Sequence, residues 1–167
     1  SIQMRKLFID EIKRQQDNTL NMAFILSQDE NLINALKTKN KSLLNYDNSL
    51  LFLHDNRDYK TLWLHIFDKN GRSFYRSWKN MSGDDLSNVR TDLDELIKNP
   101  KPTTNISSGL FDLTLKAINP IYDLNGEFLG FVEFISKFNS ISKNLKFENI
   151  EPIFILSKEK SEKIIEP

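Results

Sequence analysis

The 167-residue sequence contains no cysteine, which excludes disulfides, thiolate catalysis and cysteine-ligated zinc or iron–sulfur centres. Its two histidines are too few for a histidine-rich metal site. The 23 basic and 23 acidic residues cancel, so no net positive charge favours a nucleic-acid partner. No apolar run approaches the roughly 18 residues of a membrane-spanning helix, and no signal peptide is visible.

Sequence motifs of the common enzyme classes are also missing. There is no G-x-S-x-G, H-E-x-x-H, Walker A loop or G-x-G-x-x-G. The adjacent carboxylates of Asp84 and Asp85 are a poor acid–base pair, because neighbouring residues on a helix do not face each other. We therefore expect neither an enzyme nor a cofactor. The 39% hydrophobic content, with 12 Phe, 4 Tyr and 2 Trp, indicates instead one folded domain with a substantial core.

Glycine and proline are unevenly distributed, and they divide the chain into a helical front and a stranded back. The first glycine is Gly71 and the first proline is Pro100. Before them, apolar residues spaced by three and four predict a long helix over residues 2–27 and shorter helices from 28 and over 42–52. The middle of the long helix is polar, so we expect it to contact its partner only at its two ends.

From Thr61 onward the apolar period changes to two, which predicts strands. Asn70-Gly71 is a strong signal for a tight hairpin turn. The resulting fold is an α+β domain in which a long N-terminal helix precedes a five-stranded antiparallel sheet flanked by helices. The predicted strands cover 61–68, 73–78, 108–118, 127–138 and 153–156, and the later helices cover 82–98 and 140–147.

Several segments between residues 61 and 138 resemble, in the same order, the PAS-like Cache domains of bacterial receptors. The turn sequence Phe67-Asp68-Lys69-Asn70-Gly71 is similar to that family's hairpin. Trp78 departs from the family pattern, which often has His there, and Lys116 stands where many members have Arg. The other segments that carry the resemblance are Phe74–Trp78, Gly83–Arg90, Lys116–Tyr122 and Gly126–Phe134.

The resemblance implies a periplasmic, ligand-sensing domain of an inner-membrane chemoreceptor, sensor histidine kinase or diguanylate cyclase. It implies a helical region over 1–60, the sheet domain over 61–160, and a tail over 161–167 that leads to a membrane helix. Ligand binding would shift the sheet and the first helix and so pass a signal across the membrane. The alternative is a Cache or PAS-type module without a small-molecule ligand, which serves for dimerisation or protein binding.

The predicted hairpin places a candidate ligand-binding face on the sheet. A two-residue turn sets His65 opposite Arg76, Trp63 opposite Trp78, and Phe67 opposite Phe74, all on one face. An arginine can bind a carboxylate with two parallel hydrogen bonds, and an indole can cover a small apolar body. These residues favour a small carboxylate or an amino acid as ligand. Alternatively, Arg76 only pairs with Asp84 or Asp85 and holds the following loop.

Four further residues complete the set of candidate ligand contacts. Asp85, or its neighbour Asp84, either caps the start of a helix or receives a ligand amine. Arg90, one and a half turns later, either contacts the ligand or pairs with Asp84 or Asp85. Lys116 and Glu133 lie in apolar strands, where they would pair with each other or with a ligand. His54 is expected to be exposed and without a role. The full candidate set is His65, Arg76, Trp78, Asp85, Arg90, Lys116 and Glu133.

The long first helix is also the expected surface of a weak homodimer. Its apolar residues form two patches, Met4/Phe8/Ile12 and Leu20/Ala23/Phe24. The sparse apolar face would support only weak pairing of the isolated domain, strengthened where membrane helices hold two copies together. If Phe24 faces the sheet instead, only the first patch is available.

Overall fold

A computed structural model describes residues 2–56, 59–86, 89–108, 113–147 and 149–153. The long helix α1 (Ile2–Ser27) leads into three short helices, and the sheet follows. The helices after α1 are α2 (Glu30–Thr38), the 3-10 turn η1 (Lys41–Leu43), α3 (Asp47–Asn56), α4 (Thr91–Lys98) and α5 (Phe138–Phe147). The strands are β1 (Leu62–Asp68), β2 (Ser73–Arg76), β3 (Thr103–Ser108), β4 (Leu113–Tyr122) and β5 (Phe128–Lys137).

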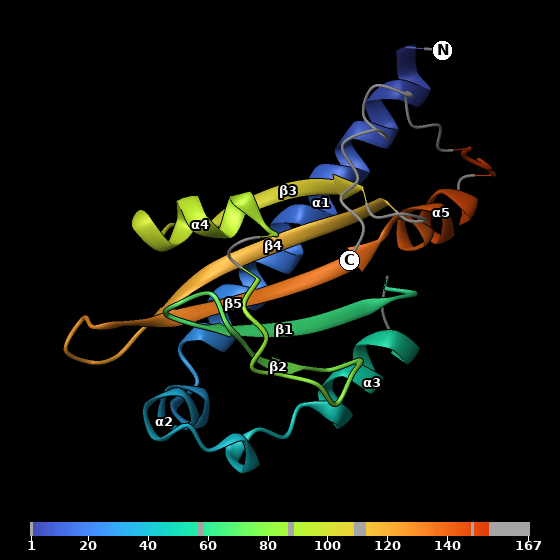
Figure 1. Ribbon diagram of the computed structural model, residues 1–167. Helices are drawn as coiled ribbons and strands as arrows, with labels where there is room; N and C mark the ends of the chain where they lie inside the picture. The colour runs from blue at the N-terminus through green and yellow to red at the C-terminus, as the bar shows by residue number, and fades with distance from the viewer. Residues whose placement is uncertain (1, 57–58, 87–88, 109–112, 148, 154–167) are drawn as a thin grey trace.

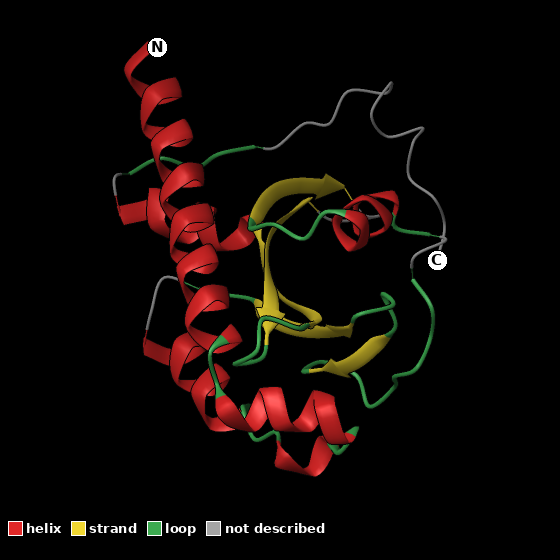
Figure 2. Ribbon diagram, turned by 90° about the vertical axis from the view of Figure 1, so that its left-hand side faces the viewer, coloured by secondary structure: helices red, strands yellow, loops and turns green. Residues whose placement is uncertain are grey.

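The five strands form one antiparallel sheet in the order β2-β1-β5-β4-β3, so the predicted fold class is confirmed. Figure 1 shows β5 in the middle of the sheet and α1 crossing behind it. In the rotated view of Figure 2 the sheet lies between α1 on one side and a shorter helix, α4, on the other. The sheet therefore has two covered faces with different helices on them.

The face toward α1 carries the larger hydrophobic core. Alternate residues of β1, including Leu62, Leu64 and Ile66, pack there with Val132 and Phe134 of β5. The middle of α1 also contacts this face, contrary to the expectation from its polar sequence: Gln15 and Thr19 are each only 1% exposed. The Thr19 hydroxyl donates to the Gln15 carbonyl oxygen at 2.8 Å, whereas the buried side-chain amide of Gln15 has no hydrogen-bond partner among the described residues.

The opposite face is packed more lightly, under α4. Phe67, Ile118 and Phe131 from three strands contact Leu93 and Leu96 of α4. This helix begins at Thr91 and not at Ser82, so the predicted helix over 82–98 is too long. Residues 83–86 instead run beside the start of β2, where Ser73 N–H donates to the Asp84 carbonyl oxygen at 3.0 Å and Gly83 N–H donates to the Ser73 carbonyl oxygen at 2.7 Å.

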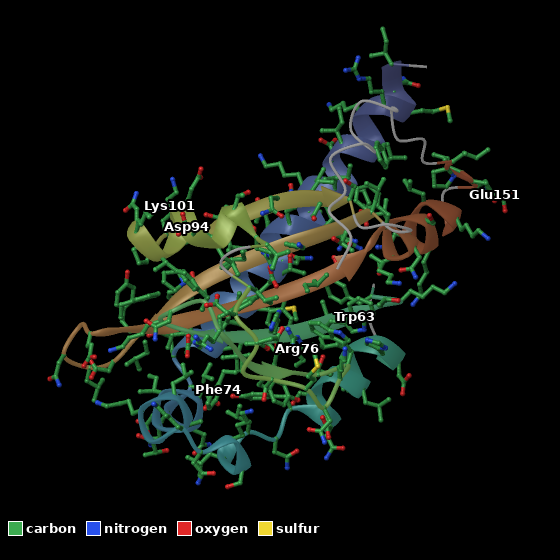
Figure 3. The ribbon with its side chains drawn as sticks, in the orientation of Figure 1. Trp63, Phe74, Arg76, Asp94, Lys101 and Glu151 are labelled. Atoms are coloured by element: carbon green, nitrogen blue, oxygen red, sulfur yellow. The ribbon has the colours of Figure 1, made fainter. Side chains whose placement is uncertain are left out.

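The β1–β2 hairpin has the predicted register over most of its length. His65 pairs with Arg76 and Ile66 with Tyr75, as expected. A β-bulge then sets Phe67 opposite Ser73, so the predicted Phe67–Phe74 pair is wrong. Phe74 joins the core on the α1 face, and Figure 3 shows it directed toward α2.

The fifth strand of the sheet is β3, a segment that the sequence analysis left out. Its residues Thr103–Ser108 are half-buried or exposed and show no apolar alternation. The predicted strand over 108–118 corresponds to β4, which lies further along the chain at Leu113–Tyr122. The strand predicted at 153–156 falls almost entirely outside the described residues.

Candidate ligand-binding site

The strand register arranges the residues on the α4-side face in rows that run across the sheet. The first row consists of Trp78, Trp63, Ile135, Lys116 and Asn105. The second row consists of Arg76, His65, Glu133, Ile118 and Thr103. Five of the seven predicted site residues therefore lie on one face, as expected: His65, Arg76, Trp78, Lys116 and Glu133.

Glu133 is the centre of a buried ionic cluster on this face. Its side chain is fully buried, and Arg90 reaches it from the start of α4, with Nη1 donating to Oε2 at 2.9 Å and Nη2 lying 2.7 Å from Oε1. Burial alone would raise the pKa of Glu133, but Arg90, His65 and Lys116 together hold that pKa well below its usual range. Glu133 is therefore a carboxylate inside the protein, neutralised mainly by Arg90.

Arg90 has a second partner that the sequence analysis missed. Its guanidinium binds the Asp92 carboxylate in bidentate geometry, at 3.1 and 2.5 Å. The predicted pairing of Arg90 with Asp84 or Asp85 is thus wrong, because α4 begins later than expected and turns Arg90 toward the sheet. Burial opposes the charge of Arg90, but Glu133 and Asp92 raise its pKa above the usual value.

His65 lies between Glu133 and β2 with only 3% of its surface exposed. Its Nδ1 is 3.5 Å from Glu133 Oε2, and its Nε2 is 2.9 Å from Ser73 Oγ. Burial is the largest influence and lowers the pKa of His65 although Glu133 opposes this. His65 is therefore a neutral ring in the middle of the cluster.

Arg76 is already bound by the protein. Nη1 and Nη2 donate to the two Asp84 carboxylate oxygens at 2.8 and 2.6 Å, and Nη1 also donates to the Met81 carbonyl oxygen at 2.9 Å. This is the alternative in which Arg76 holds the following loop. The hydrogen bond from Arg76 lowers the pKa of Asp84.

Asp85 is not placed with the other candidates. It forms an isolated bridge with Arg72, and its carboxylate lies 3.7 Å from Arg72 Nη2 at the turn end of the hairpin. Neither Asp84 nor Asp85 caps a helix, because the next helix begins at Thr91. His54 is also placed differently from the prediction: it is half-buried, and its Nε2 lies 3.1 Å from both the N and the O of Leu62, which ties α3 to β1.

Lys116 differs from the other cations of this face. It is half-buried, yet it makes no ion pair within 4 Å in the part of the chain that the structure describes, so the expected direct pair with Glu133 is not formed. Burial lowers the pKa of Lys116, and Arg90 adds to this effect while Glu133 and Asp92 oppose it. Beside it, Asn105 has a buried side-chain oxygen without a hydrogen-bond partner among the described residues.

Two indoles lie at the other end of the same row. Trp63 and Trp78 stack with ring centroids 5.2 Å apart, which confirms that they face each other. Figure 3 shows Trp63 and Arg76 on the neighbouring strands β1 and β2. A cavity of about 370 Å³ beside β2 has Arg76 and Trp78 in its lining.

The functional residue that the sequence analysis missed is Asp92, the partner of Arg90. It could have been found only by placing the start of α4 at Thr91.

A family model described as a double sensory domain of two-component sensor kinases matches residues 4–162, nearly the whole chain. The chain belongs to this dCache family. The predicted Cache resemblance is therefore confirmed, and the role that the family description gives this dCache domain is sensory. No curated protein sequence matches the chain.

Solved sensor domains share the fold of this dCache domain at low sequence identity. The Escherichia coli DcuS sensor domain is 14% identical with a TM-score of 0.63, over 81% of this chain and 98% of that one. The sensor domain of the Vibrio cholerae histidine kinase DctB is 14% identical with a TM-score of 0.59, over 81% of this chain and 54% of that one. The periplasmic domain of V. cholerae LuxQ is 13% identical with a TM-score of 0.54, over 90% and 72%. The chain thus spans about half the length of the DctB structure.

Proposed function

We propose that this dCache domain is the periplasmic, ligand-sensing part of a membrane-bound receptor and that it binds a small carboxylate on the α4-side face of its sheet. The family match and the shared fold of the DcuS, DctB and LuxQ sensor domains support a sensory role. In the described part of the chain, no helix is both long and apolar enough to cross a membrane.

The observation that carries the proposal is the state of Lys116. Two other basic groups of this face, Arg76 and Arg90, are neutralised by Asp84, Asp92 and Glu133. A third, Lys137, lies with its Nζ over the Trp63 ring, 4.9 Å from the ring centre. Lys116 is half-buried and forms no ion pair with any residue that the structure describes, and a half-buried ammonium group is stabilised by an anion that approaches it closely. The amide of Asn105 next to it and the stacked indoles of Trp63 and Trp78 along the row would contact the rest of the ligand.

The same contacts favour an organic acid over an amino acid. An amino acid would need a carboxylate for its amine, and the candidates were Asp84, Asp85 and Glu133. Each of these already holds an arginine: Arg76, Arg72 and Arg90, respectively. Binding of an amine there would require breaking an existing ion pair, whereas Lys116 is available for an acid without such a cost.

Calorimetry with short mono- and dicarboxylic acids tests this proposal. We expect at least one acid to bind and Lys116→Gln to weaken it roughly 10- to 100-fold, the effect of one charge-assisted hydrogen bond. Lys101→Gln removes the same charge from an exposed position before β3 and should leave the affinity unchanged. Unchanged affinity of Lys116→Gln for a bound acid, or no binding of any acid by the folded parent, contradicts the assignment and favours the ligand-free alternative.

The second part of the proposal concerns self-association through α1. Phe8 and Ile12 pack against α5, and Ala23 is buried, so these members of the predicted patches are not available. Phe24 points outward with 56% exposure, and Ile2 and Ile9 lie on the same side of α1, about six and four turns before it. This stripe supports a weak homodimer that forms on concentration; sedimentation of Ile9→Asp/Phe24→Asp should show only monomer where the parent pairs.

The position of α1 also suggests how binding is relayed. β4 carries Lys116 on the ligand face and Asn119 on the α1 face, where the Asn119 amide donates to Ser27 Oγ at 2.9 Å. A ligand that moves β4 therefore also moves the end of α1. In the full receptor this displacement would pass toward the membrane.

A further inference from the structure

A second, cationic cleft lies at the turn end of the β1–β2 hairpin. Its volume is about 520 Å³, and it is bounded on one side by the end of α2 and η1 and on the other by the hairpin turn. None of its lining residues belongs to the two rows that contain Lys116 and Glu133. One of them, Ser73, lies opposite Phe67, next to these rows. The cleft is therefore separate from Lys116 and Glu133, although it shares Lys41 and Phe74 with the cavity beside β2.

The lining of this cleft contains more basic than acidic side chains. Lys37, Lys39 and Lys41 come from the α2 end, and Lys69 and Arg72 come from the hairpin. The only acidic residues in the lining are Asp68 and Glu127. Five cations thus share the cleft with two carboxylates.

Both carboxylates are already engaged. The Asp68 side chain accepts hydrogen bonds from the backbone N–H groups of Asn70 and Arg72, at 2.9 and 3.0 Å, and so is used by the turn. Glu127 pairs with Lys69 at 3.3 Å. Among the described residues of the lining, neither carboxylate is therefore without a partner.

Three cations of the cleft lack a close carboxylate partner. Among the described residues, Lys39 and Lys41 form no ion pair within 4 Å. Arg72 makes a long contact with Asp85 at 3.7 Å and donates to the Gly83 carbonyl oxygen at 3.4 Å. Lys41 Nζ instead donates to Ser82 Oγ and lies 5.7 Å from the centre of the Phe74 ring. In contrast, Lys37 is neutralised by Asp123 at 2.8 Å.

The helix dipole accounts for only part of this arrangement, namely for Lys39, which is the C-cap residue of α2. A lysine in the last turn of a helix, such as Lys37, complements the negative C-terminal end. Lys41 lies beyond α2, and Arg72 lies on a different element across the cleft. Their convergence places positive charge around an enclosed volume whose apolar part is formed by Leu36, Phe74 and Leu129.

We propose that this cleft is a second binding site, for a compact anion with two or more negative charges, held by Lys39, Lys41 and Arg72. An anion with several charges can satisfy cations on both sides of the cleft at once, which a single carboxylate cannot do. Phosphate anions and polycarboxylates share this chemistry. Ser73 connects the two sites, because it lines the cleft and its hydroxyl contacts His65.

The test is calorimetry of the whole chain with inorganic pyrophosphate in one arm and citrate in the other. We expect binding in at least one arm, weakened by added salt, and the arm that binds identifies the anion as a phosphate or a polycarboxylate. The double variant Lys39→Gln/Lys41→Gln should lose affinity by roughly tenfold or more. The matched control, Lys6→Gln/Lys13→Gln, removes two exposed charges from α1 and should bind as the parent does.

The outcomes separate this proposal from that of the carboxylate site. If Lys116→Gln still binds the multivalent anion while Lys39→Gln/Lys41→Gln does not, the cleft is an independent site. If neither anion binds, or if the two double variants lose affinity equally, the second site is refuted. If Lys116→Gln abolishes the binding, the anion occupies the other face and the cleft proposal is again wrong.

Discussion

Replacing Arg90 by leucine removes the main counter-charge of a carboxylate that has no access to water. Glu133 is 0% exposed, and the remaining groups near it are His65, held neutral by burial, and Lys116, which makes no ion pair with it. Removing one partner of a buried ion pair costs about 3–5 kcal/mol. This is a large part of the roughly 5–15 kcal/mol by which domains of this kind are stable.

Urea unfolding followed by circular dichroism measures this loss. With a slope of about 2 kcal/mol per molar urea, the unfolding midpoint should fall by roughly 2 M. Arg72→Leu is the control, because the exposed Arg72–Asp85 contact at 3.7 Å should be worth less than about 1 kcal/mol. The double variant Arg90→Leu/Glu133→Met removes both charges and should recover most of the lost stability.

The pH dependence of the Arg90→Leu variant gives an independent check. In the parent, the pKa of Glu133 in the folded state is held below its ordinary value of 4.5. The ionised Glu133 therefore contributes to stability above pH 4.5, and this contribution is lost as the pH falls through the lower, folded-state pKa. In the variant, burial raises the pKa of Glu133 above 4.5, so the penalty is greatest at neutral pH and shrinks as the pH falls. A midpoint difference that is the same at pH 7 and pH 5, or a double variant as unstable as the single one, would refute this reasoning.

Two further variants probe the backbone and a helix end. Gly130→Ala would place a Cβ atom 2.0 Å from the Phe67 carbonyl oxygen and should lower the free energy of unfolding, measured by thermal unfolding, by at least about 2 kcal/mol. Gly126 also has a positive φ but has open space around it, so Gly126→Ala should cost only about 1 kcal/mol. Equal losses for the two variants would contradict the steric argument. Asp29→Ala removes the side-chain cap that accepts from Leu32 N–H at 2.9 Å and should cost about 1 kcal/mol, while Asp29→Asn, which keeps an acceptor, should cost little.

Local patterns predicted much of the fold. The alternation of β1 and β2 predicted His65 opposite Arg76 and Trp63 near Trp78. The predicted two-residue turn is wrong, because Asp68 N–H donates to the Arg72 carbonyl oxygen at 2.9 Å around a three-residue loop, and the bulge restores the predicted pairing. The bulge at Phe74 could not be predicted, because it depends on the core beside α2 that receives the phenyl ring. β3 was missed because its residues are half-exposed and lack the apolar alternation on which strand prediction depends.

The partners of the charged residues were harder to predict. Arg90 and Glu133 are 43 positions apart and meet only because α4 crosses the sheet near β5. The adjacent carboxylates Asp84 and Asp85 looked equivalent in the sequence, but the backbone pairing of residues 83–86 with the start of β2 sends one to Arg76 and the other to Arg72. Such choices follow from tertiary packing, which local spacing does not encode.

The central position of β5 has a consequence for how this domain can change during evolution. All residues from Leu129 to Ser136 are buried, and the strand supplies Glu133 to one face and Val132 and Phe134 to the core on the other. A substitution there must fit two neighbouring strands and a packed layer together. Lys116 and Asn105, on β4 and the outermost strand, are only half-buried and have fewer such constraints. New ligand preferences can therefore arise most readily at the periphery of the sheet while its centre remains unchanged.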